Sequence, residues 1–409
     1  MRPALSCAAP ASPTRHQRHR PEETTLYRVV QAHLDTFVAF VDTETGGASL
    51  PTFVTDEFDA FLACGILAHG FLRLRCNGCM EEKLVAFSCK RRGICPSCGT
   101  RRMAEAAAHL VDHVIPKVPV RQWVLSFPIP LRSLFAVHPV LLAPILQIIH
   151  RAIATFLIDQ TGIKRDQAAT GAVTLIQRFG SAANLNVHLH ALVLDGVYGK
   201  PDAAGTSGTP DESMPAPAAA PIFHAAAAPT HAALQALLGK IITRILRLLT
   251  RLGHLVEEDG QTTLAGGVPD PDDVMTPLQA AAANCRIAQG PRAGQKVLSL
   301  QLAPRHLGRS GESTALCANA HGFSLHAGVY IAADDRRGLE QLCRYVTRPA
   351  ISNERLSVNR AGQVVLKLKT AELYLARQVG NQERDVESAG KKTGMQQQIA
   401  WVGECMFHC

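Results

Sequence analysis

Apolar residues recur at three- and four-residue intervals in several long segments of the chain, which is the period of an amphipathic α-helix. This pattern predicts helices over residues 23–43 and 56–67. It also predicts a helix that starts after Cys98 and ends at Pro116, because proline cannot continue a helix. A further helix, amphipathic and basic, is predicted over residues 241–256.

Short apolar runs bounded by turn-forming residues predict β-strands. The runs are Gln122–Phe127, Ala172–Phe179, Asn186–Leu194, Gly322–Ile331 and Val364–Leu368. The second and third runs are joined by Gly-Ser-Ala-Ala-Asn, a turn sequence that predicts a β-hairpin. The mixture of helices and strands indicates an α+β fold.

Changes in composition along the chain predict its domain organisation. The first segment carries four arginines and no acid, and a later one is rich in alanine, proline and glycine. The predicted segments are a disordered basic arm (1–20), an N-terminal helical domain (21–110), a larger domain (117–370) that contains a linker (199–236) and a helical insertion (237–300), and an atypical tail (371–409).

The charge of the chain points to an anionic partner. It has 42 lysines and arginines against 34 acids, a formal net charge of +8 and an isoelectric point near 9.0. Nucleic acid is the commonest partner of such a protein. A hydrophobic content of 47% with 19% charged residues is that of a globular chain.

A membrane protein is not expected. The most apolar window, Val137–Ile149, is interrupted by His138, Pro139 and Pro144 and is too short to span a bilayer. The two prolines are expected to split the helical pattern over 131–158. The N-terminus lacks the apolar stretch of a secretory signal, so we expect a reducing compartment.

Cysteines predict a zinc site. Cys76-Asn-Gly-Cys79 and Cys95-Pro-Ser-Cys98 are separated by fifteen residues, the C-x₂-C-x₁₅-C-x₂-C spacing of a tetrahedral zinc centre. Four thiolates leave no open coordination position, so the Zn²⁺ is predicted to be structural. Cys89 is interpreted as a spare buried thiol rather than a zinc ligand. Cys64 and His69 are similarly weak candidates for zinc ligands.

The same segment is basic. Between Phe71 and Met103 there are eight lysines and arginines against two glutamates. We expect this surface to contact DNA phosphates, although a merely solvated basic face is the alternative. The predicted DNA-binding residues here are Arg73, Arg75, Lys90, Arg91, Arg92, Arg101 and Arg102.

A histidine pair and a tyrosine are the candidate catalytic residues. His188-Leu189-His190 lies in a predicted strand, where alternation places both imidazoles on one face. Two such imidazoles can share one metal ion, although such pairs also arise by chance. Tyr345 lies on a predicted helix over residues 335–347, with Arg344 and Arg348 beside it.

Several long stretches carry a family resemblance over roughly residues 20–370. They are CNGC…FSCKRRGICPSCGTRRMAEAAAHLVDHVIP, QWVLSFP, QRFGSAANLNVHLHALVLDGVY, GFSLHAGVY and LEQLCRYVTRPAIS. The chain resembles the rolling-circle transposases of the insertion-sequence-91 family, which belong to the HUH endonuclease superfamily. The resemblance implies a small antiparallel sheet with helices on one face, preceded by the zinc-binding module.

The resemblance also implies a function. In the superfamily a histidine pair binds Mg²⁺ or Mn²⁺, and a helical tyrosine nicks single-stranded DNA, leaving a 5′-phosphotyrosine and a free 3′-OH. Carried over, His188 and His190 would be the ligands and Tyr345 the nucleophile. Gln177, on the strand paired with the histidines, is the preferred third ligand, and His326 is its rival. Arg344 and Arg348 would contact the DNA.

The implied partners are single-stranded DNA at transposon ends and targets, in the cytoplasm of a bacterial cell at its nucleoid. Family members often have two tyrosines four residues apart, but Gln341 and Pro349 occupy the flanking positions here, as in the single-tyrosine branch. A lone tyrosine would complete two strand transfers with a second subunit (a homodimer), with the 3′-OH, or by sequential turnover.

The tail over 371–409 does not resemble the family and is expected to impair activity. Two other functions stay open: a DNA-binding protein that has lost its activity, and a metal-dependent hydrolase of a small substrate.

Overall fold

The computed structural model describes residues 20–180, 182–199, 220–258, 261–265, 273–297, 316–367 and 398–401. The predicted arm lies outside these ranges except for Arg20. Residues 200–219 of the predicted linker lie outside them as well. Of the predicted tail, only 398–401 is described.

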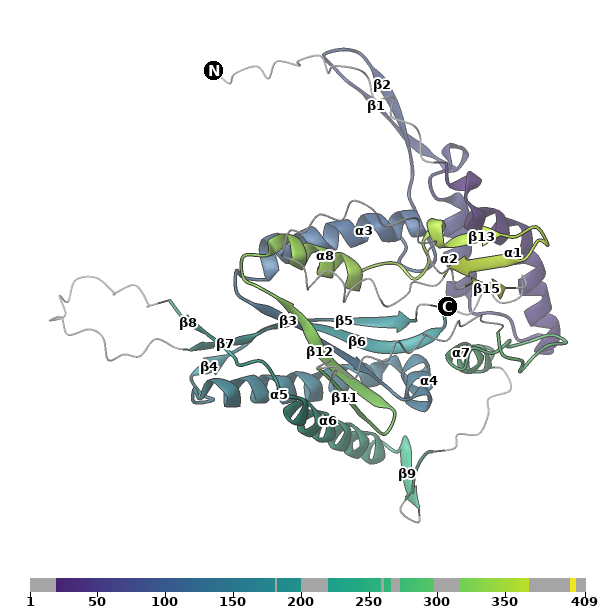
Figure 1. The fold of residues 1–409 in the computed structure, drawn as a ribbon. Coiled ribbons are helices and arrows are strands. Elements are labelled where there is room, and N and C mark those ends of the chain that lie inside the picture. The colour runs from purple at the N-terminus through teal and green to yellow at the C-terminus, as the bar shows by residue number, and fades with distance from the viewer. Residues whose placement is uncertain are drawn as a thin grey trace, which may run out of the picture.

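A five-stranded antiparallel sheet forms the centre of the molecule (Figure 1). Its order is β11 (Cys317–Ala320), β12 (Phe323–Ile331), β3 (Val120–Ser126), β6 (Leu185–Leu194) and β5 (Ala172–Phe179). Four of these strands were predicted from the sequence to within two residues at each end, and β11 was not. The turn between β5 and β6 also forms as expected.

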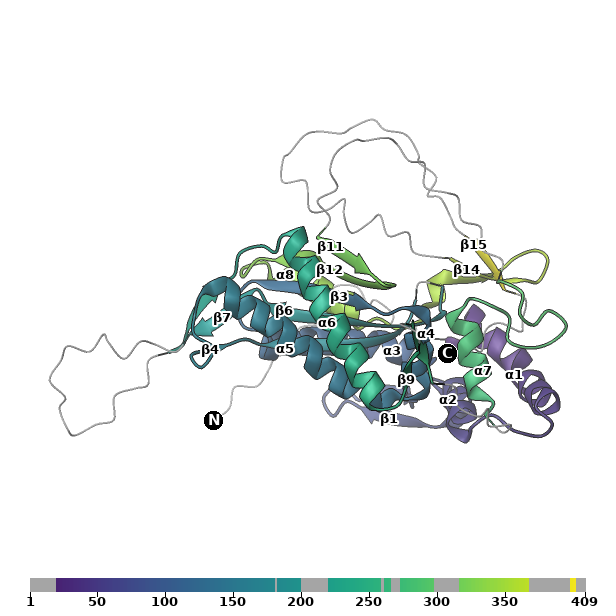
Figure 2. The ribbon, with the colours of Figure 1, turned by 90° about the horizontal axis from the view of Figure 1, so that it is seen from below.

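One face of the sheet carries large apolar side chains, among them Trp123, Leu125 and Leu189. Helices α5 (Leu142–Thr161) and α6 (His231–Arg251) pack on this face, as Figure 2 shows from below. The helix α4 (Ile129–Val137) and the 3₁₀ turn Pro139–Leu141 belong to the same core.

The opposite face is covered by two other helices. α3 (Pro96–His109), its π-helical extension (Leu110–Val114) and α8 (Arg336–Val346) lie over it and share a second core with Leu192 and Leu194. The sheet is therefore covered on both faces (Figures 1 and 2), which corrects the expectation of helices on one face.

The segment Pro139–Thr161 is long and apolar enough to cross a membrane by length and composition. Its apolar side chains, such as Ile145 and Ile153, lie instead in the core beneath the sheet. Pro144 does not split α5, because it falls in the first turn, where a helix has no backbone hydrogen bond to lose.

The N-terminal helices share a core with segments far along the chain. α1 (Thr25–Glu44) and α2 (Thr52–Ala63) pack with α7 (Met275–Ala283), β13 (Leu356–Val358) and β14 (Val364–Lys367). The last strand, β15 (Gln398–Trp401), pairs with β14. Short 3₁₀ turns lie at Pro21–Glu23, Leu67–His69 and Asn353–Arg355.

Ordered elements also occupy the ranges predicted as linker and insertion. β8 (Ile222–Ala225) pairs with β7 (Gly196–Gly199), which pairs with β4 (Ala168–Ala169). α6 begins ten residues before the predicted helix start and is part of the main core. The hairpin of β9 (Leu255–Glu258) and β10 (Gln261–Leu264) follows it.

A two-stranded hairpin, β1 (Phe71–Arg75) and β2 (Glu82–Ala86), projects from the body of the molecule (Figure 1). The sequence analysis did not predict it. Its base is closed by hydrogen bonds from Gly65 N to Phe87 O and from Phe87 N to Gly70 O, at 2.9 and 3.0 Å.

Candidate functional site: a histidine pair, a tyrosine and a cysteine cluster

The histidine pair lies on the inner strand β6, on the face that α3 and α8 cover. His188 is opposite Ser126 of β3 and Gln177 of β5, so these side chains form one row across the sheet. The rings of His188 and His190 have centroids 4.9 Å apart. The predicted sharing of one face by both imidazoles is confirmed.

Both imidazoles are held by their Nδ1 atoms. His188 Nδ1 lies 2.6 Å from the carbonyl oxygen of Asn186, to which it donates, and this leaves Nε2 as an acceptor. His190 Nδ1 lies 2.8 Å from the amide of Gln122. Within the described part of the chain, His190 Nε2 is buried without a hydrogen-bond partner.

Burial keeps both rings neutral. It lowers the pKa of His190 to about 3, with smaller contributions from the charges of His188 and Arg348. Burial is also the first cause that lowers the pKa of His188. Neutral imidazoles with Nε2 directed into the site are suitable ligands for a divalent cation. The buried Nε2 atom of His190, which has no hydrogen-bond partner in the described structure, is the observation that fits a bound cation.

Gln122 is a site residue that the sequence analysis missed. It lies on β3, is 3% exposed, and contacts His190 through its amide. Half a turn of that amide presents Oε1 to the ring, so that Nδ1 donates and Nε2 keeps its lone pair for a metal. Gln122 is the one polar residue at the start of the apolar run predicted as a strand, and that position was the signal available in the sequence.

Tyr345 lies near the end of α8, directly over the histidines. Its ring centroid is 6.0 Å from that of His190, and the two rings meet edge to face at 86°. The guanidinium carbon of Arg348 lies 4.4 Å from the Tyr345 centroid. The structure thus brings together Tyr345 and His190, which lie 155 positions apart in the sequence.

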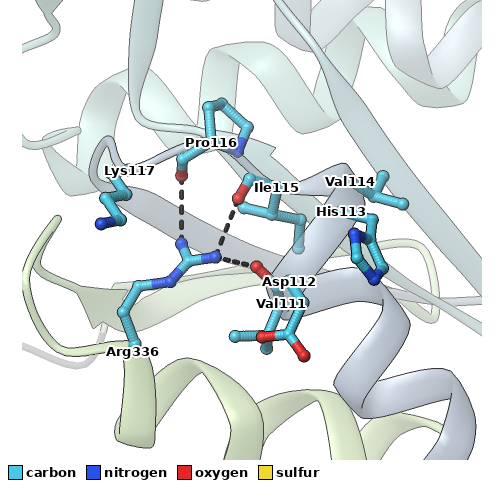
Figure 3. Close-up of a pocket in the computed structure, with 8 residues that line it drawn as sticks. All are labelled: Val111, Asp112, His113, Val114, Ile115, Pro116, Lys117 and Arg336. Atoms are coloured by element: carbon cyan, nitrogen blue, oxygen red, sulfur yellow. Dashed lines mark hydrogen bonds between the residues drawn. The ribbon is translucent and has the colours of Figure 1, made fainter. Parts of the chain in front are cut away.

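The start of α8 is fixed by two side chains. Asp335 accepts a hydrogen bond from Gly338 N at 2.8 Å and caps the helix. Arg336 donates to the carbonyl oxygens of Val111, Ile115 (3.0 Å) and Pro116 (3.2 Å) at the edge of a pocket (Figure 3). These carbonyls end the α3 segment, so a cation there also complements the helix dipole.

The two candidates for a third ligand lie at different distances from the pair. Gln177 is the direct cross-strand neighbour of His188 and is 4% exposed. His326 is opposite Val124, so β3 separates it from His190. Neighbouring strands are about 4.8 Å apart, which favours Gln177. In the structure its amide lies 3.5 Å from the carbonyl of Val346.

The two arginines predicted beside the tyrosine have different positions. Arg348 covers the Tyr345 ring, whereas Arg344 forms an exposed ion pair with Glu340 at 2.7 Å. Arg132, which was not predicted, also lies near the site. Its charge contributes to the lowered pKa of His188, and its Nε donates to the Phe127 carbonyl at 2.6 Å.

Four cysteines converge beside α2 and the start of α3. Cys64, Cys89, Cys95 and Cys98 have sulfur atoms all within 4.8 Å of one another. The closest pairs are separated by 3.5 to 3.7 Å. Four sulfurs about 2.3 Å from one Zn²⁺ would be about 3.8 Å apart, so the cluster has the dimensions of a tetrahedral zinc site.

The predicted ligand set is therefore corrected. Cys95 and Cys98 belong to the cluster, but Cys76 and Cys79 lie exposed at the tip of the β1–β2 hairpin. The hairpin separates Cys64 from Cys89 in sequence, and the closure of its base brings them together. Cys89, interpreted above as a spare thiol, and Cys64 take the places of the hairpin cysteines.

The predicted DNA-contacting residues of this region lie at its surface. Arg73 forms an ion pair with Glu82 at 2.7 Å, and Arg91 lies 3.6 Å from Glu57. Arg102 donates to the Lys90 carbonyl at 2.6 Å, and Arg101 to the Ser88 hydroxyl at 2.9 Å. Arg75, Lys90 and Arg92 are exposed.

Comparison with known protein families identifies the chain as a transposase with a zinc-binding domain. Residues 29–127 match the family model of the transposase zinc-binding domain, and residues 171–396 match that of the "Putative transposase" family. The second match covers more than half of the chain, so the protein belongs to this family, the insertion-sequence-91 transposases. No curated protein and no solved structure matches the chain.

The second match also corrects one expectation. It extends to residue 396, so most of the segment 371–409 falls within the family region. The prediction that family similarity ends near residue 370 was wrong. β15, inside this segment, pairs with β14 and continues its sheet.

Proposed function

We propose that this transposase is a metal-dependent endonuclease and strand transferase for single-stranded DNA, with Tyr345 as its nucleophile. The observation that carries the proposal is the position of the Tyr345 ring 6.0 Å from His190, whose Nε2 is buried without a partner in the described structure. Metal-assisted phosphoryl transfer requires a nucleophile next to the metal ligands, and Tyr345 and His190 are in direct ring contact.

In the proposed reaction the Tyr345 hydroxyl oxygen attacks a backbone phosphorus. The P–O3′ bond breaks, and the leaving oxygen takes up a proton to become a free 3′-OH. The DNA 5′ phosphate remains on the tyrosine. In the second step a 3′-OH attacks the phosphotyrosine, which joins the strands and restores the tyrosine hydroxyl.

The residues around the tyrosine have complementary roles. His188, His190 and Gln177 would hold Mg²⁺ or Mn²⁺, which when bound would polarise the scissile phosphate. Arg348 places a positive charge beside the ring where negative charge develops on the attacking oxygen and the phosphate. α3 and α8 shield this face of the sheet, which strengthens these electrostatic interactions.

The proposal assigns DNA binding to the basic surface of the hairpin and the start of α3. Arg75, Lys90, Arg91, Arg92 and Arg101 are exposed and lie on or near the hairpin and the first turns of α3. Such a surface binds phosphates without sequence preference and weakens as salt is raised.

The test is a covalent-adduct assay with the full-length protein. A labelled single-stranded oligonucleotide from the element's end is incubated with protein and Mn²⁺ and run on a denaturing gel. We expect a protein–DNA band with the wild type, none with Tyr345→Phe, and none with His190→Ala. Tyr330→Phe is the matched control, because this tyrosine lies on β12 with its ring against Arg121 rather than against the histidines, and its adduct should persist.

Two results would decide against the proposal. An adduct that survives Tyr345→Phe would mean that another residue is the nucleophile. Folded wild-type protein that binds the oligonucleotide in a salt-sensitive way, with no adduct on any terminus sequence, would favour a DNA-binding protein without nicking activity.

A further inference from the structure

The tip of the β1–β2 hairpin presents a pair of thiols in a closed turn. Cys76 and Cys79 are both exposed there. The turn is closed by hydrogen bonds from Met80 N to Cys76 O and from Cys76 N to Glu81 O, each 2.9 Å. Met80 has a positive φ of 60°, a left-handed conformation that ends the turn and directs the chain into β2.

The turn also places backbone donors at one sulfur. The N–H groups of Cys79 and Gly78 are directed at Cys76 Sγ. A Cβ added at Gly78 would lie 3.9 Å from that sulfur, so the sulfur is folded back over the turn. Backbone N–H groups directed at a thiolate stabilise its charge, as in many metal-binding turns.

This pair has only half of a tetrahedral ligand set. In the described part of the chain, the only group of three or more potential ligands is the cluster of Cys64, Cys89, Cys95 and Cys98. The hairpin strands, each five residues long, separate the tip with Cys76 and Cys79 from the four-cysteine cluster at the base. A zinc ion at the tip would therefore need two ligands from outside this part of the chain.

The same hairpin has a largely apolar face that the described part of the chain leaves exposed. Strand alternation puts Leu72, Leu74, Val85 and Phe87 on one face, and all four are exposed. Lys83, the cross-strand partner of Leu74, is the charged residue of this face. An isolated two-stranded hairpin is marginally stable in water, and a contiguous exposed apolar patch marks a contact surface.

We propose that Cys76 and Cys79 bind one zinc ion together with the same two cysteines of a second copy of the chain. A two-fold axis through the ion converts two thiolates into four, which completes the tetrahedron with no other ligand. A side-by-side arrangement of the two hairpins about this axis would also bring their exposed apolar faces together.

The inference does not depend on the proposed nicking activity, because it rests on the hairpin alone. It has a functional consequence all the same. A dimer joined at the hairpin tips holds two copies of Tyr345 in one assembly, so a protein with one tyrosine per site would have two nucleophiles for its two strand transfers.

The experiment measures zinc content and mass of the full-length protein under reducing conditions, by elemental analysis and light scattering. We expect a dimer with about 1.5 zinc ions per chain, one in each four-cysteine cluster and one shared. The double variant Cys76→Ser with Cys79→Ser should be a monomer with about one zinc ion per chain. The matched control, Cys285→Ser with Cys317→Ser, should behave as the wild type.

Three outcomes would overturn the proposal. Wild-type monomer with about one zinc ion per chain would mean that the tip binds none. Wild-type monomer with about two would mean that the chain's own residues, such as Cys405 or Cys409, complete the site. A dimer that keeps its mass and zinc content in the double variant would place the interface elsewhere.

Discussion

Replacing Gln122 with leucine tests whether the hydrogen bond to His190 sets the affinity of the proposed catalytic metal. Gln122 is buried, and its amide lies 2.8 Å from His190 Nδ1. Leucine has a similar volume but no polar atom, so the substitution removes the contact without opening a large cavity. The imidazole then loses the group that fixes its orientation and tautomer.

The expected loss follows from this contact. Removing the outer partner of a metal-bound histidine costs about 10- to 100-fold in metal affinity. That corresponds to about 1.4 to 2.8 kcal/mol at 25 °C. The range agrees with the cost of about 1 to 3 kcal/mol for leaving one buried polar group, here His190 Nδ1, without its partner. Gln122→Glu keeps an acceptor and should lose less.

The assay is Mn²⁺ binding to the full-length protein, followed by electron paramagnetic resonance of the free ion, together with the Mn²⁺ dependence of adduct formation. Gln235→Leu is the matched control, because Gln235 is an exposed glutamine that donates to the Asn319 carbonyl away from the site. An unchanged Mn²⁺ affinity in Gln122→Leu would refute the assigned role of Gln122, and an equal loss in the control would refute the specificity of the effect.

Three further outcomes are expected. Cys89→Ser should lose the zinc of the four-cysteine cluster, whereas Cys79→Ser should keep it, as measured by zinc content after mild chelation. Asp195→Asn should lower the free energy of unfolding in urea by about 3 to 5 kcal/mol, because it leaves the buried guanidinium of Arg121 without its partner at 2.7 Å. Arg336→Met should reduce adduct formation by releasing the start of α8, and Arg336→Lys should restore part of it.

The central sheet and the Tyr345 helix could be predicted because their signals are local. Alternation along β6 places both histidines on one face, and Asp335 with the following apolar stripe defines α8. The assignment of helices to the two faces of the sheet could not be predicted in this way. Whether α3 and α6 cover the same face or opposite faces depends on connections between elements that periodicity does not contain.

The cysteine cluster shows why regular spacing misled the ligand assignment. Cys76 and Cys79 have the C-x₂-C spacing of a zinc turn, and the turn does form, but at the far end of a hairpin. Cys64 and Cys89 are 25 positions apart and meet only because the hairpin between them closes at its base. A motif rule uses separation along the chain, whereas coordination depends on separation in space.

The cluster and the tyrosine are joined through α3. Cys95 occupies the N-cap position of this helix and Cys98 lies in its first turn, so a bound zinc ion would fix its start. The same turn lies against the end of α8: a Cβ on Gly99 would come within 2.8 Å of Pro349 Cβ, which leaves room only for glycine. The far end of the α3 segment is held to α8 by Arg336. Since α8 is thus anchored at both ends to one helix, loss of the zinc should displace Tyr345 from the histidines as well as unfold the cysteine cluster.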